Sequence, residues 1–423
     1  MPLVHIGDLE NGMVLADDLF SPRGCFLLAE GSVLQAAHLQ NLKGWGVLEV
    51  DISQQSLGKE YLRKQAELAP FIDRAEGFLY RRFALNNLKK EPEATIFRHA
   101  VKRFALSLQQ GWDPVVFTEG VPVASDAKFP AVNVVALLKG NIALPSPVIV
   151  FDKIIEAIEN PETTPHSLAE IISKDASLCA RLLHLVNGPG SRFLGQIDSI
   201  SRAVSLLGTD KLASLLLGGS VASQFGNISE KLLNMDAFWR HSIRCGLFAR
   251  ALAAQLKLPG KEVCFVGGLL HDIGRLVLLD KLPEQYAQVI DTARKEKLPM
   301  SRAEKKMLKT DHGFVGKQLA IRWRLPAKIR WMIGGHHSLY SSFYAKEACV
   351  VHVADILAHA CGHEISLTNE IPPLQRKAWE ETGLKVEMLG PLIRQVDHEF
   401  KEIIRIFFDD VPSEQDDRYL VNA

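Results

Sequence analysis

The stretch FVGGLLHDIGRLVLLDKLP, residues 265–283, places a histidine and an aspartate side by side in an otherwise apolar segment. The apolar residues around His271 and Asp272 are of the kind that fills a protein core. Burying an ionisable side chain is strongly unfavourable unless that side chain is paired or coordinated. The two residues are therefore expected to have partners inside the protein, and the rest of the chain offers candidates.

The bulk composition is that of an ordinary globular protein, and 423 residues are enough for two or three domains. Lys plus Arg and Asp plus Glu both number 49, so the net charge gives no support for binding nucleic acid or a membrane surface. No apolar run approaches the ~18 residues that a membrane helix requires. The N-terminus, MPLVHIGDLENGMV, has no basic region followed by an apolar stretch, so we expect no signal peptide.

The six cysteines are scattered along the chain without CxxC spacing. This pattern favours buried free thiols in a reducing compartment over a disulfide framework or a zinc ribbon. The sequence therefore predicts a cytoplasmic protein.

Hydrophobic patterning divides the chain into parts with different periodicities. Short apolar runs separated by glycines indicate strands near the N-terminus, with a short helix over 35–42, and helical spacing dominates most of the rest. Ser167 and Glu170 form an S-x-x-E pattern that predicts a helix start at Ser167. The fold class expected is mainly α, a helical bundle preceded by a small β-rich module. The predicted parts are a β-rich module at 1–55, a helical segment at 56–111, a linker at 112–141, a helical domain at 142–360 and a C-terminal helical extension packed on it at 361–423.

Further histidines and an aspartate lie on both sides of the HD pair. Upstream, FWRHSIRCGLFARALAAQL predicts an amphipathic helix in which His241 shares the apolar face with Cys245 and Phe248. Downstream of the pair the series continues with His312, His336, His337 and Asp355. A lone inward histidine is more often a hydrogen-bonded core residue than a ligand, but an ordered series of this kind favours a metal site or the remnant of one.

The residue types in this series suit divalent metal ions. Imidazole nitrogens and carboxylates bind first-row metals, and a carboxylate can bridge two ions where an imidazole cannot. Two neighbouring ions can activate a water and hold a phosphoryl group. Because the residues are far apart in sequence, such a site would have to be assembled by helices that converge in three dimensions.

The ordered series resembles the HD superfamily of metal-dependent phosphohydrolases and, within it, the HDOD family. The HDOD resemblance covers about residues 142–360, including the run from Asp175 to Asn187, ISRAVSLLGTDKL, FVGGLLHDIGRLVL, DHGFVGKQLAIRWRLP and GGHHS. It implies a helical signalling or regulatory module of bacterial type that acts through protein contacts, often without demonstrated catalysis. Carried over to this chain, the implied metal ligands are His241, His271, Asp272, His312, His336 or His337, and Asp355.

The resemblance also assigns individual roles. One or two divalent ions of unspecified identity would be bound. Asp272 would be the bridging carboxylate, and it would be the catalytic residue if the protein were an enzyme. Arg275 stands where HD-GYP enzymes carry a phosphate-contacting lysine. Arginine could still hold a phosphate, with different geometry.

The N-terminal stretch GDLENGMVLADDLFSPRGCFLLAEGSVL resembles the small module that precedes many HD-GYP enzymes, which hydrolyse cyclic di-GMP. However, Ser338 follows the histidine pair in place of the glutamate of H-H-E, the G-Y-P motif is absent, and Ala237 stands where trinuclear members carry a glutamate ligand. These departures argue against cyclic di-GMP hydrolysis.

Three hypotheses follow for function. The first is a regulatory protein with a signalling protein partner, homodimerisation being compatible with it, whose N-terminal module senses or docks. The second is a divalent-metal phosphohydrolase acting on a nucleotide or phosphoester. The third is a purely structural metal or polar network that ties the helices together.

Overall fold

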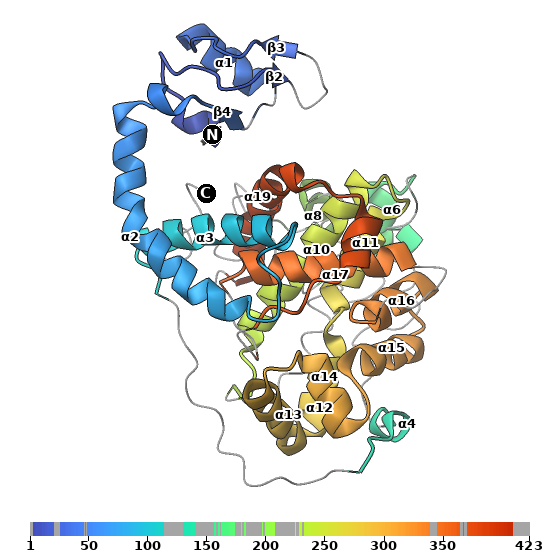
Figure 1. Ribbon diagram of the computed structural model, residues 1–423. Helices are drawn as coiled ribbons and strands as arrows, with labels where there is room; N and C mark the ends of the chain where they lie inside the picture. Colours follow the sequence, from blue (N-terminus) through green and yellow to red (C-terminus); the bar gives the residue numbers. More distant parts are fainter. Residues whose placement is uncertain are drawn as a thin grey trace. The chain divides into compact units, whose positions relative to one another are not determined.

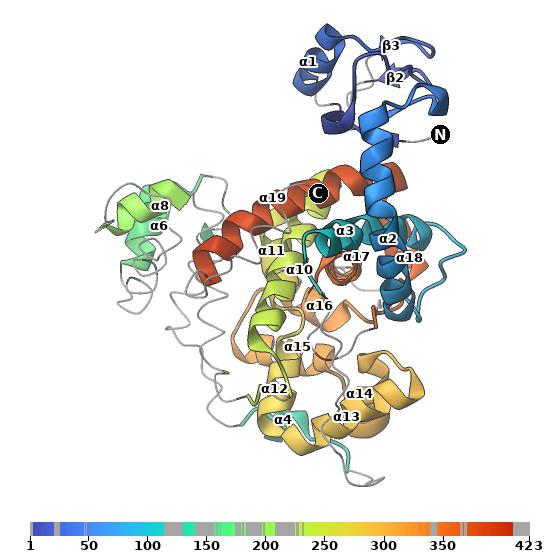
Figure 2. The ribbon, with the colours of Figure 1, turned by 90° about the vertical axis from the view of Figure 1, so that its left-hand side faces the viewer.

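The computed structural model describes two compact units, Met1–Glu76 and Gly77–Ala423 (Figure 1, Figure 2). The residues that it describes are 3–20, 26–113 except 46 and 48, 130–139, 232–338, 345–363, 367 and 370–408, with short segments between 156 and 230. Most of the run from Asp175 to Asn187 lies outside the described residues. The boundary between the units falls inside the helix α2, and the five-part division expected from the sequence stays a prediction.

The N-terminal unit is built from short strands around one helix. β1 pairs antiparallel with β4, with Val4 opposite Val50, and β2 pairs antiparallel with β3. The helix expected over 35–42 is present as α1. In chain order the elements are β1 (Leu3–His5), η1 (Ile6–Asp8), β2 (Leu19–Phe20), β3 (Phe26–Leu28), α1 (Ala36–Gly44), β4 (Glu49–Asp51), η2 (Gln54–Ser56) and the start of α2 (Lys59–Arg82).

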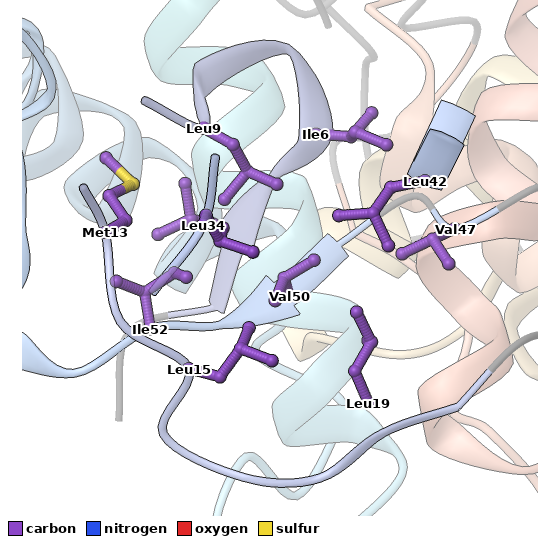
Figure 3. Close-up of a cluster of buried hydrophobic side chains, with 11 residues drawn as sticks. Ile6, Leu9, Met13, Leu15, Leu19, Leu34, Leu42, Val47, Val50 and Ile52 are labelled. Carbon is purple, nitrogen blue, oxygen red and sulfur yellow. The ribbon is translucent and has the colours of Figure 1, made fainter. Parts of the chain in front are cut away.

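The buried side chains of this unit, among its described residues, are apolar. Its strands are too short to bury much surface singly, so residues from strands, turns and α1 contribute together, as Figure 3 shows. Val4, Leu34, Leu42 and Ile52 are completely buried. Burial of such side chains stabilises a fold by about 1.5–3 kcal/mol each relative to exposure.

The described secondary structure of the second unit consists of helices. α10, α11 and α17 pack side by side, α12 packs on α15, α11 on α16, α18 on α17, and α19 on α10 (Figure 2). Its helices are α3 (Glu93–Gln109), α4 (Val134–Leu137), α6 (Pro165–Ile172), α8 (Ile200–Leu207), α10 (Met235–Gln255), α11 (Lys261–Leu270), α12 (Ile273–Lys281), α13 (Pro283–Glu296), α14 (Met300–Leu308), α15 (His312–Arg322), α16 (Ala327–Gly335), α17 (Ala345–Cys361), α18 (Arg376–Thr382), η4 (Val386–Met388) and α19 (Leu389–Phe408). The predicted mainly helical fold with a small β-rich N-terminal module is confirmed.

Two local expectations change. The N-cap of α6 is Thr164, three residues before the predicted start at Ser167. Thr164 accepts from the backbone N–H of Ser167, which is the third residue of the helix. Within the predicted linker, the described part contains α4, which packs on α15. Among the described helices, none combines the length and the apolar character needed to cross a bilayer.

Candidate metal centre

The HD pair lies at a break between two helices. α11 ends at Leu270 and α12 begins at Ile273, so His271 and Asp272 form the junction rather than the middle of one continuous helix. The apolar side chains before and after them are buried, which fixes both helices in the core. The junction turns the two polar side chains toward the centre of the helical unit, where both are almost completely buried.

The downstream histidines also lie at helix ends. His312 is the first residue of α15, whose N-cap Asp311 accepts from the backbone N–H of Phe314 at 2.7 Å. His336 and His337 follow directly after α16. Helix ends therefore present four of the five histidines expected from the sequence, whereas His241 lies within α10, as its inward-facing pattern predicted.

Glycines allow these helices to approach closely enough for the side chains to meet. A Cβ atom at Gly274 would overlap the carbonyl oxygen of His312, which brings α12 against the start of α15. A Cβ atom at Gly268 would lie 2.9 Å from the Cα of Gly246, at the contact between α11 and α10. Any side chain at these positions would separate helices that carry the histidine series.

One half of the cluster surrounds Asp272. Its Oδ1 lies 3.2 Å from Nε2 of His312 and 3.7 Å from Nε2 of His336, and its Oδ2 lies 3.4 Å from Nε2 of His271. The ring of His337 lies beside that of His336, with 4.0 Å between ring centroids. Asp272 thus faces imidazoles from three different elements.

The other half surrounds Asp355 on α17. Its Oδ1 lies 3.1 Å from Nε2 of His241, 3.5 Å from Nε2 of His271 and 3.4 Å from Nε2 of His359. His271 therefore contacts both carboxylates and joins the two halves. All seven residues expected from the sequence come together. Their possible ligand atoms, with that of His359, form three groups, and within each group the atoms lie within 4.8 Å of one another. The groups are Asp272, His312, His336 and His337; His241, His271 and Asp272; and His241, Asp355 and His359.

The converging atoms lack well-formed hydrogen bonds within the described part of the chain. They are Nε2 of five histidines and three carboxylate oxygens: His241, His271, His312, His336 and His337 with Asp272 Oδ1 and Asp355 Oδ1 and Oδ2. Buried polar atoms are nearly always satisfied in native proteins. The atoms gathered around this centre could therefore hold a cation.

The opposite ring nitrogens are held by acceptors outside the cluster. Nδ1 of His271 donates to the carbonyl of Gly268 at 2.6 Å, and Nδ1 of His336 donates to the carbonyl of Ile333 at 2.7 Å. Nδ1 of His312 donates to Glu304 Oε2 at 2.6 Å. Because a carbonyl or carboxylate oxygen can only accept, Nδ1 carries a proton in each of these rings, and Nε2 is the nitrogen that faces the centre, where it could bind a metal ion. Metal-binding histidines are oriented in this way.

The electrostatics of the cluster keep both aspartates ionised. Burial raises the pKa of a carboxyl group, but Arg275 and then His271 hold the pKa of Asp272 well below its usual range. Burial is likewise outweighed at Asp355, whose pKa is held well below normal by His359 and His241. Ionised carboxylates in a buried site are ready to coordinate a cation.

The histidines of the cluster differ in the direction in which their pKa is shifted. Burial, followed by repulsion from neighbouring imidazoles, lowers the pKa of His337 well below normal, so this ring is neutral. Burial also disfavours charge at His312, but Glu304 outweighs it and raises the pKa to about 9. A metal ion competes with such a proton, so ion binding would release it. The donor set and its second layer of hydrogen bonds fit divalent metal.

Arg275, for which the sequence suggested a phosphate contact, lies close to the cluster. Its Nε lies 3.1 Å from Asp272 Oδ1, and the side chain is almost completely buried. It also lines a pocket together with His337 and His359. The pocket's other walls are Leu85, Leu298, Pro299, Met300, Ser301, Glu370 and Pro372.

Sequence reasoning missed two residues of this centre. His359 lies four residues after Asp355 and therefore on the same face of α17, a spacing that could have identified it. Glu304 orients His312 by accepting from both its ring and its backbone N–H. Glu304 lies on the separate helix α14, and no local pattern links it to the histidine series.

Comparisons with known proteins agree with the geometry. A family model, the HDOD domain, matches residues 144–339. An uncharacterised protein of Treponema pallidum is 30% identical over 202 residues, which are 46% of this chain and 37% of that protein. The match therefore spans little more than a third of the relative's length.

Two crystal structures share the fold. An HDOD domain protein of unknown function from Geobacter sulfurreducens has a TM-score of 0.52 at 23% identity, over 65% of this chain and 97% of that one. A protein from Marinobacter aquaeolei VT8, provisionally named for signal transduction, has a TM-score of 0.53 at 20% identity, over 61% of this chain and 58% of that one. The HDOD domain model thus matches somewhat less than half of the chain, at residues 144–339, and the two crystal structures share its helical fold.

Proposed function

We propose that this protein is a regulatory HDOD protein that binds divalent metal ions at the cluster around Asp272 and Asp355. The observation that carries the proposal is the convergence of unsatisfied Nε2 and carboxylate oxygen atoms in a buried centre. A bound cation would balance the charge of the two buried carboxylates and give the converging Nε2 atoms a common partner. Bound ions would satisfy them all at once.

The cluster suits two ions. A neutral imidazole has one free lone pair, so His241 can serve only one of the two groups that contain it. The two groups that share His241 therefore correspond to a single ion position near Asp355. The second ion position is formed by Asp272, His312, His336 and His337. Asp272 also belongs to a group with His241 and His271, so it can bridge the two positions. Predominantly imidazole ligands favour first-row transition metals over Mg²⁺ or Ca²⁺.

Two features near the cluster support regulation rather than turnover. Arg275 is engaged with Asp272 rather than standing free for a phosphate. Ser338, which follows the histidine pair in place of a carboxylate, accepts from Lys305 at 3.2 Å instead of offering another acidic group to the centre. In this reading the HDOD unit acts through contacts with a signalling protein in the cytoplasm, and residues 1–55 sense or dock.

The test of metal binding is elemental analysis of the purified protein beside two variants. Asp272→Asn removes the bridging charge at nearly constant volume, and it is expected to abolish stoichiometric metal. Asp280→Asn, near the far end of the helix that follows Asp272, alters a carboxylate that is paired with Lys281 outside the cluster, and it should keep the wild-type metal content. Equal metal content in wild type and Asp272→Asn would contradict the proposal.

A phosphohydrolase remains the second candidate because a pocket reaches Arg275, His337 and His359. An ion bound there would supply charge stabilisation for a phosphoester, and Arg275 would orient its phosphate. The assay is hydrolysis of bis(p-nitrophenyl) phosphate and of cyclic dinucleotides by the metal-loaded protein. Hydrolysis at enzyme-like rates that disappears in Asp272→Asn would replace regulation by catalysis as the function.

A further inference from the structure

His359 is an additional histidine in the cluster that the HD-type series does not include. It lies on α17 one turn after Asp355, and its Nε2 is 3.4 Å from Asp355 Oδ1. Its ring centroid is 4.1 Å from that of His241. His359 can therefore contribute a ligand atom to the ion position near Asp355.

His359 also lies between that position and the pocket. It lines the pocket, whereas Asp355, His241 and His271 are not among the described residues that do so. Only 9% of His359 is exposed, compared with 1% of Asp355 and none of His271. The imidazole of His359 thus separates the Asp355 half of the cluster from the pocket.

The backbone that carries His359 is held firmly. Arg82 donates to the carbonyl of His359 at 2.9 Å and to that of Gly362 at 3.1 Å, and Arg103 donates to the carbonyl of Cys361 at 2.7 Å. These guanidinium groups satisfy carbonyls that the end of an α-helix leaves without intrahelical partners. The last turn of α17 is therefore fixed, and His359 is held in position beside Asp355.

We infer that His359 is a metal ligand that closes the coordination sphere of the ion near Asp355. Structural metal sites are filled by protein ligands, whereas catalytic sites leave one position open for solvent or substrate. With His359 bound, the ion position near Asp355 would have no place for an incoming group from the pocket. The inference rests on the proposed metal binding, and it gives a physical reason for a metal-binding HDOD protein without turnover.

The experiment compares the protein loaded with Co²⁺ in three forms: wild type, His359→Ala and His363→Ala. Co²⁺ reports its coordination through visible absorption, and azide is the small anionic probe for an open position. The wild type should bind two ions and show no spectral change with azide. His359→Ala should show a saturable azide-dependent change and hold one of the two ions about tenfold more weakly or worse.

His363→Ala is the matched control, because His363 lies four residues after His359, beyond the end of α17, and its Nε2 bonds to Ser107 outside the cluster. It should behave as the wild type. Azide binding to wild-type protein would overturn the inference even if His359→Ala failed to fold, and so would an unchanged spectrum in a folded His359→Ala. Failure of the wild type to take up Co²⁺ would contradict the proposed metal binding itself, which distinguishes the two results.

Discussion

The two compact units bury opposite kinds of side chain at their centres. In the N-terminal unit the described residues that are buried are apolar, such as Leu15 and Val50 (Figure 3). The helical unit encloses Asp272, Asp355 and a group of histidines, surrounded in turn by apolar helices. An apolar core is stabilised by burial alone. A polar centre stabilises a fold only when each group has its partner, so the stability of the helical unit should depend on metal while that of the N-terminal unit should not.

Removing metal should have the largest effect on stability, and this effect should be confined to the helical unit. A ligand that binds the native state at 100 times its Kd stabilises that state by about 2.7 kcal/mol, so two such ions would contribute about 5 kcal/mol. We expect chelation to speed amide hydrogen exchange across residues 235–361 and to leave residues 3–52 unchanged. Exchange measured by mass spectrometry on peptides from each unit checks both halves of the prediction.

The control is addition of excess metal after chelation, which should restore protection in the helical unit. Equal loss of protection in both units would show that chelation acts on the protein generally. No change in either unit would mean that the polar centre is satisfied without a cation.

Local patterns predicted the elements well but not all their ends. The helical fold followed from apolar periodicity, which reflects burial along one face and is present in the sequence itself. The start of α6 was misplaced because Ser167 and Glu170 match the S-x-x-E pattern. Pro165 directly after Thr164 was the better indicator, since proline suits the first position of a helix.

The candidate site could be predicted only where its residues follow an ordered series. His271 and Asp272 were evident because adjacent polar residues stand out in an apolar segment. The distances between them and residues on other helices depend on helix packing, which no spacing rule encodes. Glu304 shows the limit, because it reaches His312 only through the packing of α14 against α15.

The apolar core provides the second test of the comparison. Leu15 is 1% exposed, and Leu15→Ala would remove methyl groups and leave a cavity, at a cost of about 3 kcal/mol. We expect this variant to lose exchange protection within residues 3–52 while it binds as much metal as the wild type. Segment-resolved exchange and elemental analysis on one sample measure both quantities.

Leu62→Ala is the matched control, because Leu62 lies in the same unit and is half exposed. Its effect on stability should stay within about 0.5 kcal/mol. A loss of metal in Leu15→Ala would contradict the independence of the two centres.

Glu304 provides the smallest and most selective test, because it supports a ligand without being one. Its carboxylate accepts from the ring and backbone of His312 and from the hydroxyl of Tyr286 at 2.5 Å, and it is completely buried. Glu304→Gln keeps the shape but weakens the acceptor that fixes the His312 tautomer. Outer partners of this kind typically contribute 10–100-fold to metal affinity, or about 1.4–2.7 kcal/mol.

We therefore expect Glu304→Gln to retain both ion positions and to lower the affinity of the one that contains His312. Competition with a metal indicator measures the two affinities. Glu296→Gln is its control, since Glu296 is an exposed carboxylate that is paired with Lys306. If Glu304→Gln weakened neither ion, the polar centre would depend on its direct ligands alone. If it weakened the position near Asp355 equally, the two halves would act as a single unit through His271.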